Sequence, residues 1–280
     1  GFFQKLFIAD RLALYVNPVF NNLEDFNGTR LWVASYFFAF QIYCDFAGYT
    51  NIARGCAKAL GINLSINFKQ PYLADSISEF WRKWHITLSS WFKDYVYIPL
   101  GGNKVKTPKY FLNLMIVFLV SGLWHGANWT FIIWGGIHGA LLVLEVIKRK
   151  YFNFKMPRIL SFIITFQLVV FAWVFFRSDD LSSSILYFEN MFQLNISTLT
   201  QIGFFKKGMY DIKTLDIILC FFSVLVLIIV GLLEKFKNQR LEEFILKQNK
   251  YLRWCVYYTL IFSVLEFGVF ESQKFIYFQF

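Results

Sequence analysis

The alternation of long apolar runs with basic clusters constrains this chain more than any other feature. A helix of about 20 residues is about 30 Å long, which matches the hydrocarbon core of a bilayer. The chain is 57% hydrophobic and only 16% charged, too apolar for a water-soluble domain of 280 residues. The sequence therefore predicts an all-α, polytopic membrane protein. The predicted spans are residues 31–50, 110–124, 129–147, 159–176, 215–233 and 254–271.

The formal charge of +10 comes from Lys and Arg residues that flank the apolar runs. Basic clusters at 104–109, 148–158 and 235–253 are expected on the cytoplasmic side by the positive-inside rule. The break at 125–128, the loop 177–214 and the C-terminal tail are then expected on the other side. No basic helix stands apart from the apolar runs, so the expected partner is the lipid bilayer and not nucleic acid.

One apolar stretch, SGLWHGANWTFIIWGGIHG at 121–139, is interrupted by two histidines, five glycines and an asparagine. Such residues are unfavourable in hydrocarbon unless other protein surrounds them, so they indicate a working site. The preceding run, 110–124, would be only about 22 Å long as a helix, which places His125 below the membrane surface. The glycines either let a substrate reach the backbone or serve ordinary helix packing.

A second candidate histidine, His85, follows a helix start at Ser76 and Glu79, which have the spacing of a capping box. Apolar residues then recur at helical spacing and predict one amphipathic helix of about five turns at the membrane interface or at the rim of a cavity. His85 lies at the edge of that apolar stripe. It is either an interfacial histidine bonded to a neighbour or a partner of His125. The stripe consists of Ile77, Phe80, Trp81, Trp84, Leu88, Trp91, Phe92 and Tyr95.

Asp45 is the only acid of the predicted span 31–50. It either lies at the interface or faces a polar cavity among helices. The following residues, 51–72, predict a short amphipathic helix and then an extended loop.

An imidazole titrates near neutral pH and can accept a proton from a hydroxyl that attacks an acyl group. The three histidines lie at 85, 125 and 138, with no HExxH pattern and no cysteine pair beside them, so no metal is expected. Phosphate-binding and nucleotide-binding glycine patterns are absent from the sequence, and no bound cofactor is expected.

Two long motifs, EFWRKWHITLSSWFKDYVYIPLGGN (79–103) and SGLWHGANWTFIIWGGIHG (121–139), resemble those of the membrane-bound O-acyltransferase family. Within it the chain is similar to the bacterial branch that O-acetylates alginate, peptidoglycan and other polysaccharides. The stretch CDFAGYTNIARGCAKALGINLSINFKQPY (44–72) fits the same branch. Motif resemblance covers about residues 1–147.

The resemblance implies that His125 is the catalytic histidine and that His85 is a second functional histidine. It also implies tilted helices around a tunnel, with acetyl-CoA as the cytosolic donor substrate. Family members carry further membrane helices upstream, so 1–280 is expected to be one membrane domain from the C-terminal portion of a longer chain. The motif region is 31–147 and additional membrane helices are expected over 159–271.

The predicted function is transfer of an acetyl group to hydroxyls of an extracytoplasmic polysaccharide by a multi-pass protein of the cytoplasmic membrane. His125 would act as general base, or as acyl acceptor if a covalent intermediate forms, and His85 would orient the donor or His125. Trp124, Asn128 and Trp129 are candidate residues of a substrate-binding cavity, with Asp45 a fourth. His138 is expected to be a packing or supporting residue.

Two alternatives remain at this point. The chain is either an enzyme or a conduit that hands acyl groups to a separate extracytoplasmic acetyltransferase, which is an expected partner in both cases. A lipid- or protein-directed acyltransferase is a further option, and IPLGGN (98–103), typical of the polysaccharide branch, argues against it.

Overall fold

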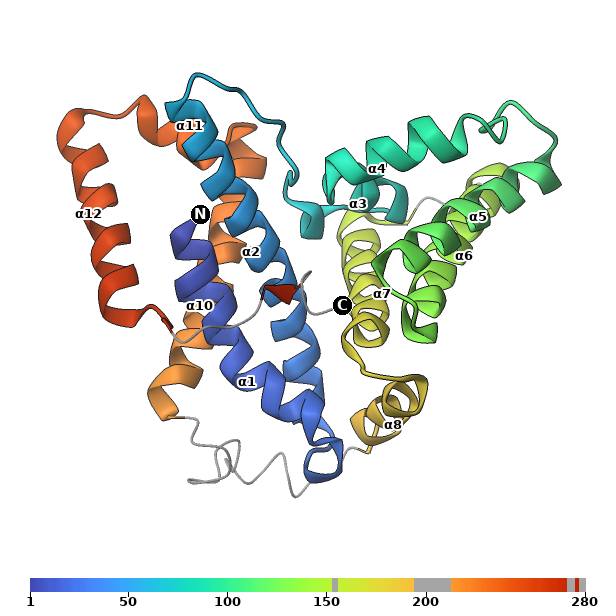
Figure 1. Cartoon of the computed structure of the whole chain (residues 1–280), viewed down its shortest axis with the longest axis horizontal. Helices are drawn as coiled ribbons and strands as arrows, with labels where there is room; N and C mark the ends of the chain where they lie inside the picture. The colour runs from blue at the N-terminus through green and yellow to red at the C-terminus, as the bar shows by residue number, and fades with distance from the viewer. Residues whose placement is uncertain (153–155, 194–212, 271–274, 277–280) are drawn as a thin grey trace. The chain divides into compact units, whose positions relative to one another are not determined.

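The computed structural model describes residues 1–152, 156–193, 213–270 and 275–276, and the regular elements of these residues are all helical (Figure 1). This confirms the predicted all-α class. The chain divides into two compact units, one built from residues 1–64 and 189–279 and the other from residues 65–188. The prediction of one membrane domain over 1–280 stays a prediction.

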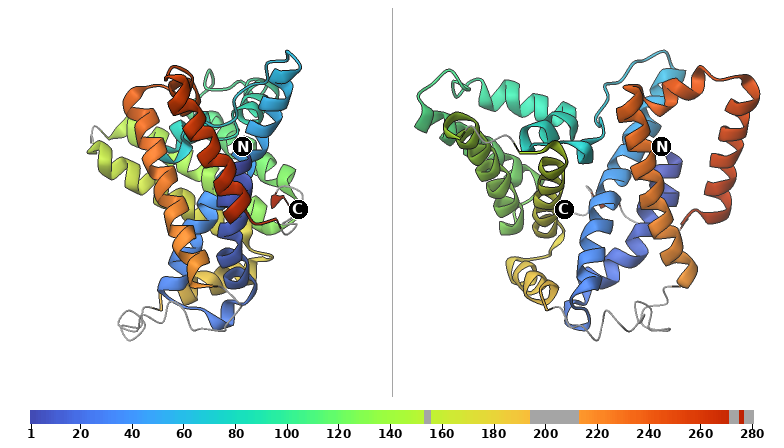
Figure 2. Two further views of the ribbon diagram at one scale, coloured as in Figure 1. Left: turned by 90° about the vertical axis from the view of Figure 1, so that its left-hand side faces the viewer. Right: turned by 180° about the vertical axis from the view of Figure 1, so that it is seen from behind.

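The first unit is organised around α2 (Thr29–Ala59), a 31-residue helix whose central residues are buried. A π-helical segment, η1 (Phe3–Ala9), continues into α1 (Asp10–Asn21), and both pack on α2. From behind, Figure 2 shows α10 (Thr214–Lys237) beside α2 and α11 (Leu241–Leu246) leading into α12 (Lys250–Phe267). The predicted amphipathic helix after residue 50 is the end of α2, and the expected extended loop follows it.

The second unit carries both motif regions. After η3 (Pro71–Leu73), two short helices, α3 (Ile77–Lys83) and α4 (Ile86–Phe92), lead through the π-helical turn η4 (Lys93–Tyr97) to a hairpin of long helices. These are α5 (Thr107–His125) and α6 (Trp129–Tyr151), which are followed by α7 (Arg158–Arg177) and α8 (Leu181–Met191). The last three residues of α8 belong to the first unit.

Two glycines set the close approach of α5 and α6. A Cβ added at Gly122 would lie 2.3 Å from the carbonyl oxygen of Phe131, and one at Gly135 would lie 2.2 Å from that of Phe118. Backbone therefore meets backbone at these points, as at small-residue contacts between membrane helices. Of the two roles considered for the glycines, helix packing accounts for these two.

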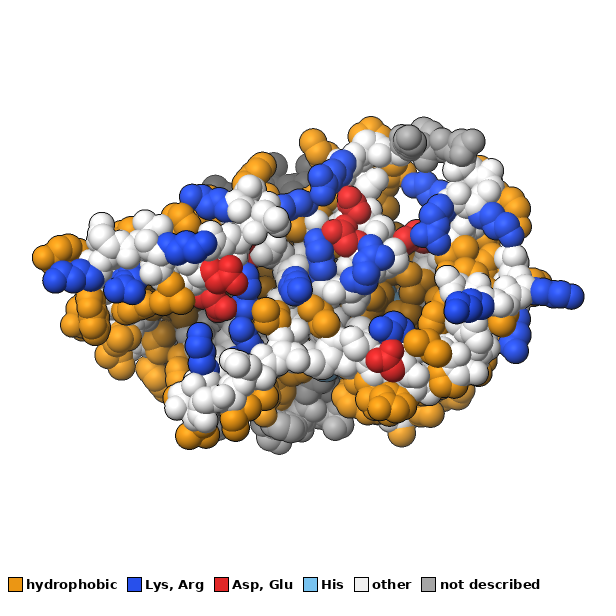
Figure 3. Space-filling model, turned by 90° about the horizontal axis from the view of Figure 1, so that it is seen from above, with side chains coloured by type: hydrophobic (Ala, Val, Ile, Leu, Met, Phe, Trp, Pro, Cys, Tyr) orange, Lys and Arg blue, Asp and Glu red, His pale blue; other side chains and the backbone are white. Residues whose placement is uncertain are grey.

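The α5–α6 hairpin has a basic end and a histidine end. Nζ of Lys150 donates to Oγ1 of Thr107 over 2.8 Å, so the start of α5 and the end of α6 lie together. The basic residues at 104–109 and 148–150 therefore share one end, and His125 lies at the other. Figure 3 views the molecule from above, toward the basic end, and Lys and Arg side chains are visible on that face.

Four helices of the described residues are long and apolar enough to cross a membrane: α5, α6, α7 and α10. They correspond to four of the predicted spans. The other two predicted spans, 31–50 and 254–271, are helical in α2 and α12, but these helices are less apolar and fall outside that set.

Three local expectations are wrong. The run 110–124 belongs to a 19-residue helix, because Thr107 and Pro108 start it earlier, and at about 28 Å it is not unusually short. The amphipathic stretch 76–95 is two helices with a break, not one helix of five turns. The predicted loop 177–214 contains α8, and residues 194–212 lie outside the described part.

Candidate active site

Helix α3 is capped as the sequence predicts. The Ser76 hydroxyl accepts the backbone N–H of Glu79 at 3.2 Å, and the Glu79 carboxylate accepts the backbone N–H of Asp75 at 2.8 Å. The Ser76 hydroxyl thus satisfies one N–H that the first turn leaves without a partner inside the helix, and the Glu79 carboxylate reaches back to the residue before the cap. The helix start is therefore determined locally.

Three hydrogen bonds attach α3 to α6. The Glu145 carboxylate accepts both the hydroxyl of Ser78, at 2.5 Å, and its backbone N–H, at 3.0 Å. One turn along α3, Nε1 of Trp81 donates to Nδ1 of His138 over 3.2 Å. Going along α3 from Ser78 to Trp81, the residue numbers of the partners on α6 decrease from Glu145 to His138. The two helices are therefore antiparallel. Helix α3 thus runs from the basic end of the hairpin into the interior of the unit.

The break between α3 and α4 lies at Trp84 and His85. Trp84 is extended (φ −100°, ψ 130°), and His85 is left-handed (φ 41°, ψ 57°). A positive φ is uncommon for a residue with a side chain and requires support from its surroundings. The preceding loop supplies that support, because Lys69 N–H donates to the Lys83 carbonyl and Ile86 N–H donates to the Asn67 carbonyl, at 3.1 and 3.0 Å.

The side chain of Asn67 also fixes the tautomer of His85. Its Oδ1 accepts the hydroxyl of Thr87 at 2.7 Å and the backbone N–H of Thr87 at 3.3 Å, and it lies 3.3 Å from Nδ1 of His85. An oxygen that receives these bonds is an acceptor, so Nδ1 of His85 donates and Nε2 is the unprotonated nitrogen of the neutral ring. Burial lowers the pKa of His85 to about 4, because the cation would lose its hydration. His85 is therefore a neutral imidazole at physiological pH.

His85 is 9% exposed and lies at the inner end of α3. Its neighbour is Asn67, 3.3 Å from Nδ1, so both interpretations, a histidine bonded to a neighbour and a partner of His125, stay predictions.

His125 is the last residue of α5 and faces an aromatic layer. Its ring lies 5.2 Å from that of Trp134 and 5.0 Å from that of Phe176, both edge to face. Trp134 also stacks on Trp173, with ring centroids 5.7 Å apart, and Trp173 contacts Trp84 at 4.9 Å. This aromatic layer, defined as Trp84, Trp134, Trp173 and Phe176, connects the residue before His85 with His125.

The structure brings His85 and His125 together within range of an electrostatic interaction between their rings. His85 reaches this position on α3, which enters from the basic end, and His125 reaches it from the opposite end of α5. The partnership of His85 with His125 stays a prediction. The His125 ring faces the aromatic layer, and Trp84 of that layer precedes His85 in the chain. Imidazoles so placed can accept and donate protons where little water competes.

His138 does not belong to that pair. It is fully buried on α6 and surrounded by the rings of Phe80, Trp81, Phe118 and Trp134. Nδ1 accepts the Trp81 N–H, so Nε2 carries the proton of the neutral ring, and this N–H has no hydrogen-bond partner among the described residues.

The predicted cavity residues beside His125 are placed differently from one another. Trp124 contacts the His125 ring at 4.9 Å but is 55% exposed, and Trp129 is 70% exposed. Asn128 caps α6 by accepting the Thr130 N–H at 3.0 Å, and its Nδ2 donates to the carbonyl of Asp179 at 2.6 Å. Asn128 therefore has a structural function in the turn after His125. Substrate binding by these three residues stays a prediction.

Asp45 lies in the first unit, within a buried ion cluster. Nζ of Lys5 lies 2.7 Å from a carboxylate oxygen of Asp45 and 2.7 Å from one of Asp10. The other oxygen of Asp45 accepts the backbone N–H of Ile276 at 2.8 Å. These contacts give Asp45 a structural role, and substrate binding by it stays a prediction.

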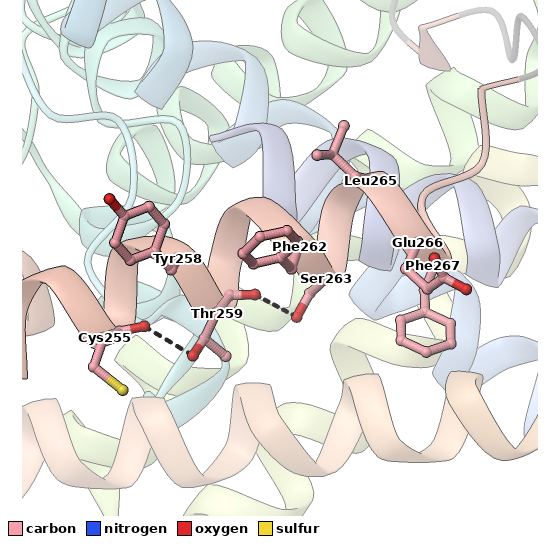
Figure 4. Close-up of a pocket in the computed structure, with 8 residues that line it drawn as sticks. All are labelled: Cys255, Tyr258, Thr259, Phe262, Ser263, Leu265, Glu266 and Phe267. Atoms are coloured by element: carbon pink, nitrogen blue, oxygen red, sulfur yellow. Dashed lines mark hydrogen bonds between the residues drawn. The ribbon is translucent and has the colours of Figure 1, made fainter.

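A groove along α12 in the first unit contains none of the candidate residues (Figure 4). Its Thr259 and Ser263 hydroxyls donate to the carbonyls of Cys255 and Thr259, one turn earlier in the same helix. Among the described residues, no three His, Cys, Asp or Glu side chains are grouped as they would be around a metal ion.

Asn67, Trp134, Trp173 and Phe176 were not identified from the sequence. Asn67 and Trp134 lie within the motif stretches 44–72 and 121–139, but neither stretch indicates which of its residues contacts a histidine. Only the tertiary contacts select them.

The comparison with known proteins addresses the family directly. Residues 25–185, more than half of the chain and including both histidines, match the model of the membrane-bound O-acyltransferase family. The chain belongs to this family.

Relatives of this chain are named for peptidoglycan, alginate and teichoic acid. It is 45% identical to the peptidoglycan O-acetyltransferase of Helicobacter pylori over 70% of this chain and 38% of the relative. It is 39% identical to the probable alginate O-acetylase AlgI of Pseudomonas aeruginosa over 86% and 45% of the two chains. It is also 32% identical to the teichoic acid D-alanyltransferase of Bacillus subtilis, over 61% of this chain and 44% of the relative. The chain spans less than half the length of these curated relatives.

Proposed function

We propose that the protein containing this chain transfers an acetyl group from a cytosolic thioester, acetyl-CoA, to hydroxyl groups of a polysaccharide outside the cytoplasm. The observation that carries the proposal is the approach of His85 and His125 from opposite ends of one helical unit. A donor entering from the basic end meets His85, and an acceptor entering from the other end meets His125. The basic end suits the phosphates of coenzyme A.

In the proposed reaction an imidazole nitrogen of His125 accepts the proton of the acceptor hydroxyl as its oxygen attacks the thioester carbonyl. The C–S bond breaks, and the thiolate leaves with the proton returned from the imidazolium. The products are an acetyl ester and a free thiol. His85, neutral and held by Asn67, orients the donor or His125 beside the aromatic layer.

The names of the relatives support a polymer acceptor, and peptidoglycan and alginate are the polymers named for the O-acetylating relatives. We place the protein in the cytoplasmic membrane as a multi-pass protein, with a separate extracytoplasmic acetyltransferase as partner.

The test compares wild-type protein with His125→Ala and His125→Gln at equal membrane content. Acetate released by mild alkali from the exported polymer is expected to fall by at least about 100-fold in both variants. Undiminished acetylation would contradict the assignment of His125.

A second measurement separates an enzyme from a conduit. Purified full-length protein is incubated with radiolabelled acetyl-CoA and no partner protein. Release of free thiol that depends on His125 is expected of an enzyme. Transfer that appears only after the extracytoplasmic partner is added would favour a conduit.

A further inference from the structure

The third histidine of the chain, His138, has a single hydrogen-bond partner within the described part of the chain although it is fully buried. Nδ1 accepts the indole N–H of Trp81 over 3.2 Å, and the two ring centroids are 4.9 Å apart at 85°. A polar ring in the interior of a membrane helix is unfavourable unless its hydrogen bonds are made. The sequence keeps this ring on α6, opposite α3.

Trp81, which donates this hydrogen bond, lies on α3 one helical turn before His85. Helix α3 has only seven residues, about two turns, so few hydrogen bonds within the helix itself hold it in place. Its orientation depends on contacts with its neighbours, chiefly the Trp81–His138 bond and the Ser78–Glu145 bonds. Of these, the Trp81–His138 bond is the nearer to the break.

Aromatic rings around Trp81 also connect it with Trp84, the residue at the break between α3 and α4. Phe80 stacks on His138 on one side and on Trp84 on the other, with ring centroids 6.2 and 5.6 Å apart. Trp81 itself packs edge to face on Trp134, which contacts His125. A rotation of α3 about its axis would therefore displace Trp84 and the residue that follows it.

We propose that His138 is a positioning residue for acyl transfer: by accepting the Trp81 N–H it fixes the rotation of α3 and so holds His85 beside His125. This rests on the proposed function, because it assumes that the reaction needs His85 in that position. His138 itself does not touch the reacting atoms. A misplacement of about 1 Å can lower a rate by about 100-fold.

The first test is Trp81→Phe in the full-length protein, which removes the N–H and keeps an aromatic ring. With acetyl-CoA as donor and membrane-bound polymer as acceptor, kcat is expected to fall about 10- to 100-fold while the donor KM stays within about twofold. Trp91→Phe is the matched control, because Trp91 is half exposed on α4 and contacts Phe92 and Tyr95 instead.

The second test restores the acceptor. His138→Asn can present its amide oxygen near the place of Nδ1, whereas His138→Leu has no acceptor. We expect the Asn variant to retain much more of the activity than the Leu variant. A double variant, Trp81→Phe with His138→Leu, is expected to be no slower than the slower single variant. Additive losses would overturn the proposal.

A third readout does not need activity. Diethyl pyrocarbonate modifies accessible histidines, and its reaction with His85 is followed by mass spectrometry of the folded protein. Trp81→Phe is expected to raise the modification rate of His85 by about threefold or more at an unchanged Tm. An unchanged rate, or loss of the folded protein in Trp81→Phe, overturns the positioning role. Absence of acyl transfer in wild-type protein would instead reject the proposed function. The modification rate of His85 would then still test whether His138 positions α3.

Discussion

Oδ1 of Asn67 lies 3.3 Å from Nδ1 of His85 and also receives both polar hydrogens of Thr87, from its hydroxyl and its backbone N–H. One amide oxygen thereby stabilises a helix start, a left-handed residue and the tautomer of a buried histidine. This contact joins residues 18 positions apart, and it leads to a first prediction.

Asn67→Leu should lower acyl transfer about 10- to 100-fold, because His85 loses the acceptor that orients its ring. Asn67→Asp keeps the acceptor and adds a negative charge, which favours the imidazolium and raises the pKa of His85 above about 4. If neutral His85 is required, the acid limb of the pH–rate profile moves to higher pH in Asn67→Asp. Rates measured between pH 4 and 8 check this, with Glu243→Gln, an exposed change on α11, as control. An unmoved acid limb would contradict it.

The pKa of His85 also predicts how stability depends on pH. The folded pKa, about 4, is below the ordinary value of 6.5, so the unfolded chain binds the proton more readily. Stability from the neutral ring is fully present above pH 6.5 and is lost as the pH falls from 6.5 to about 4. Between pH 7.5 and 5 the loss should be about 2 kcal/mol.

The measurement is thermal unfolding in detergent at both pH values for wild-type protein and His85→Gln. The difference between the two proteins removes the contributions of other titratable groups. The decrease in Tm on acidification should be smaller in His85→Gln. Equal decreases would mean that His85 is not buried as described.

The glycine contact between α5 and α6 offers a matched pair of substitutions. Gly135→Ala places a methyl group against the Phe118 carbonyl and should destabilise the protein by about 1–3 kcal/mol, with loss of activity. Gly136→Ala is the control, because its nearest neighbour is a side-chain atom of Leu119 at 3.6 Å, an ordinary contact. Similar Tm values for the two variants would refute the close approach.

Asp45→Asn tests the ion cluster of the first unit. The amide still accepts the Ile276 N–H but loses the ion pair with Lys5, and Lys5 keeps Asp10 as its partner, so we expect a loss of about 1.5–3 kcal/mol, as for a hydrogen bond to a charged group. The KM for the acyl donor, measured on the fraction of the variant that stays folded, should equal that of wild-type protein. Glu24→Gln, an exposed change in the same unit, should leave Tm unaltered. A raised KM at normal Tm would favour the predicted substrate-binding role instead.

Patterns within a few residues were enough to predict much of the second unit. The capping box at Ser76 starts α3 where expected, and the end of an apolar run places His125 at the end of α5. The break at His85 was not predictable in this way. No glycine or proline marks it, the apolar stripe continues across it, and the bonds that support its left-handed backbone come from 67–69.

The same limit applies to the surroundings of the site. Trp124, the neighbour of His125 in sequence, contacts its ring although it is 55% exposed, and Trp129 is 70% exposed. Trp134 and Phe176 contact the ring as well. Closeness along the chain does not indicate these two residues, because their contacts form only when the helices pack. Asn128 was selected for its polarity, and its hydrogen bonds are those of a helix cap.

The backbone contact at Gly122 and Gly135 has a consequence for how such a site can be remodelled. Where two main chains are in contact, no change of side-chain rotamer can create space for a larger substrate. The contact between α5 and α6 is therefore rigid. The contacts that α6 makes with α3 and α7 are between side chains, including Trp81 with His138 and Trp134 with Trp173. Selection for a bulkier acyl group should therefore yield substitutions among these aromatic residues and leave the glycines unchanged.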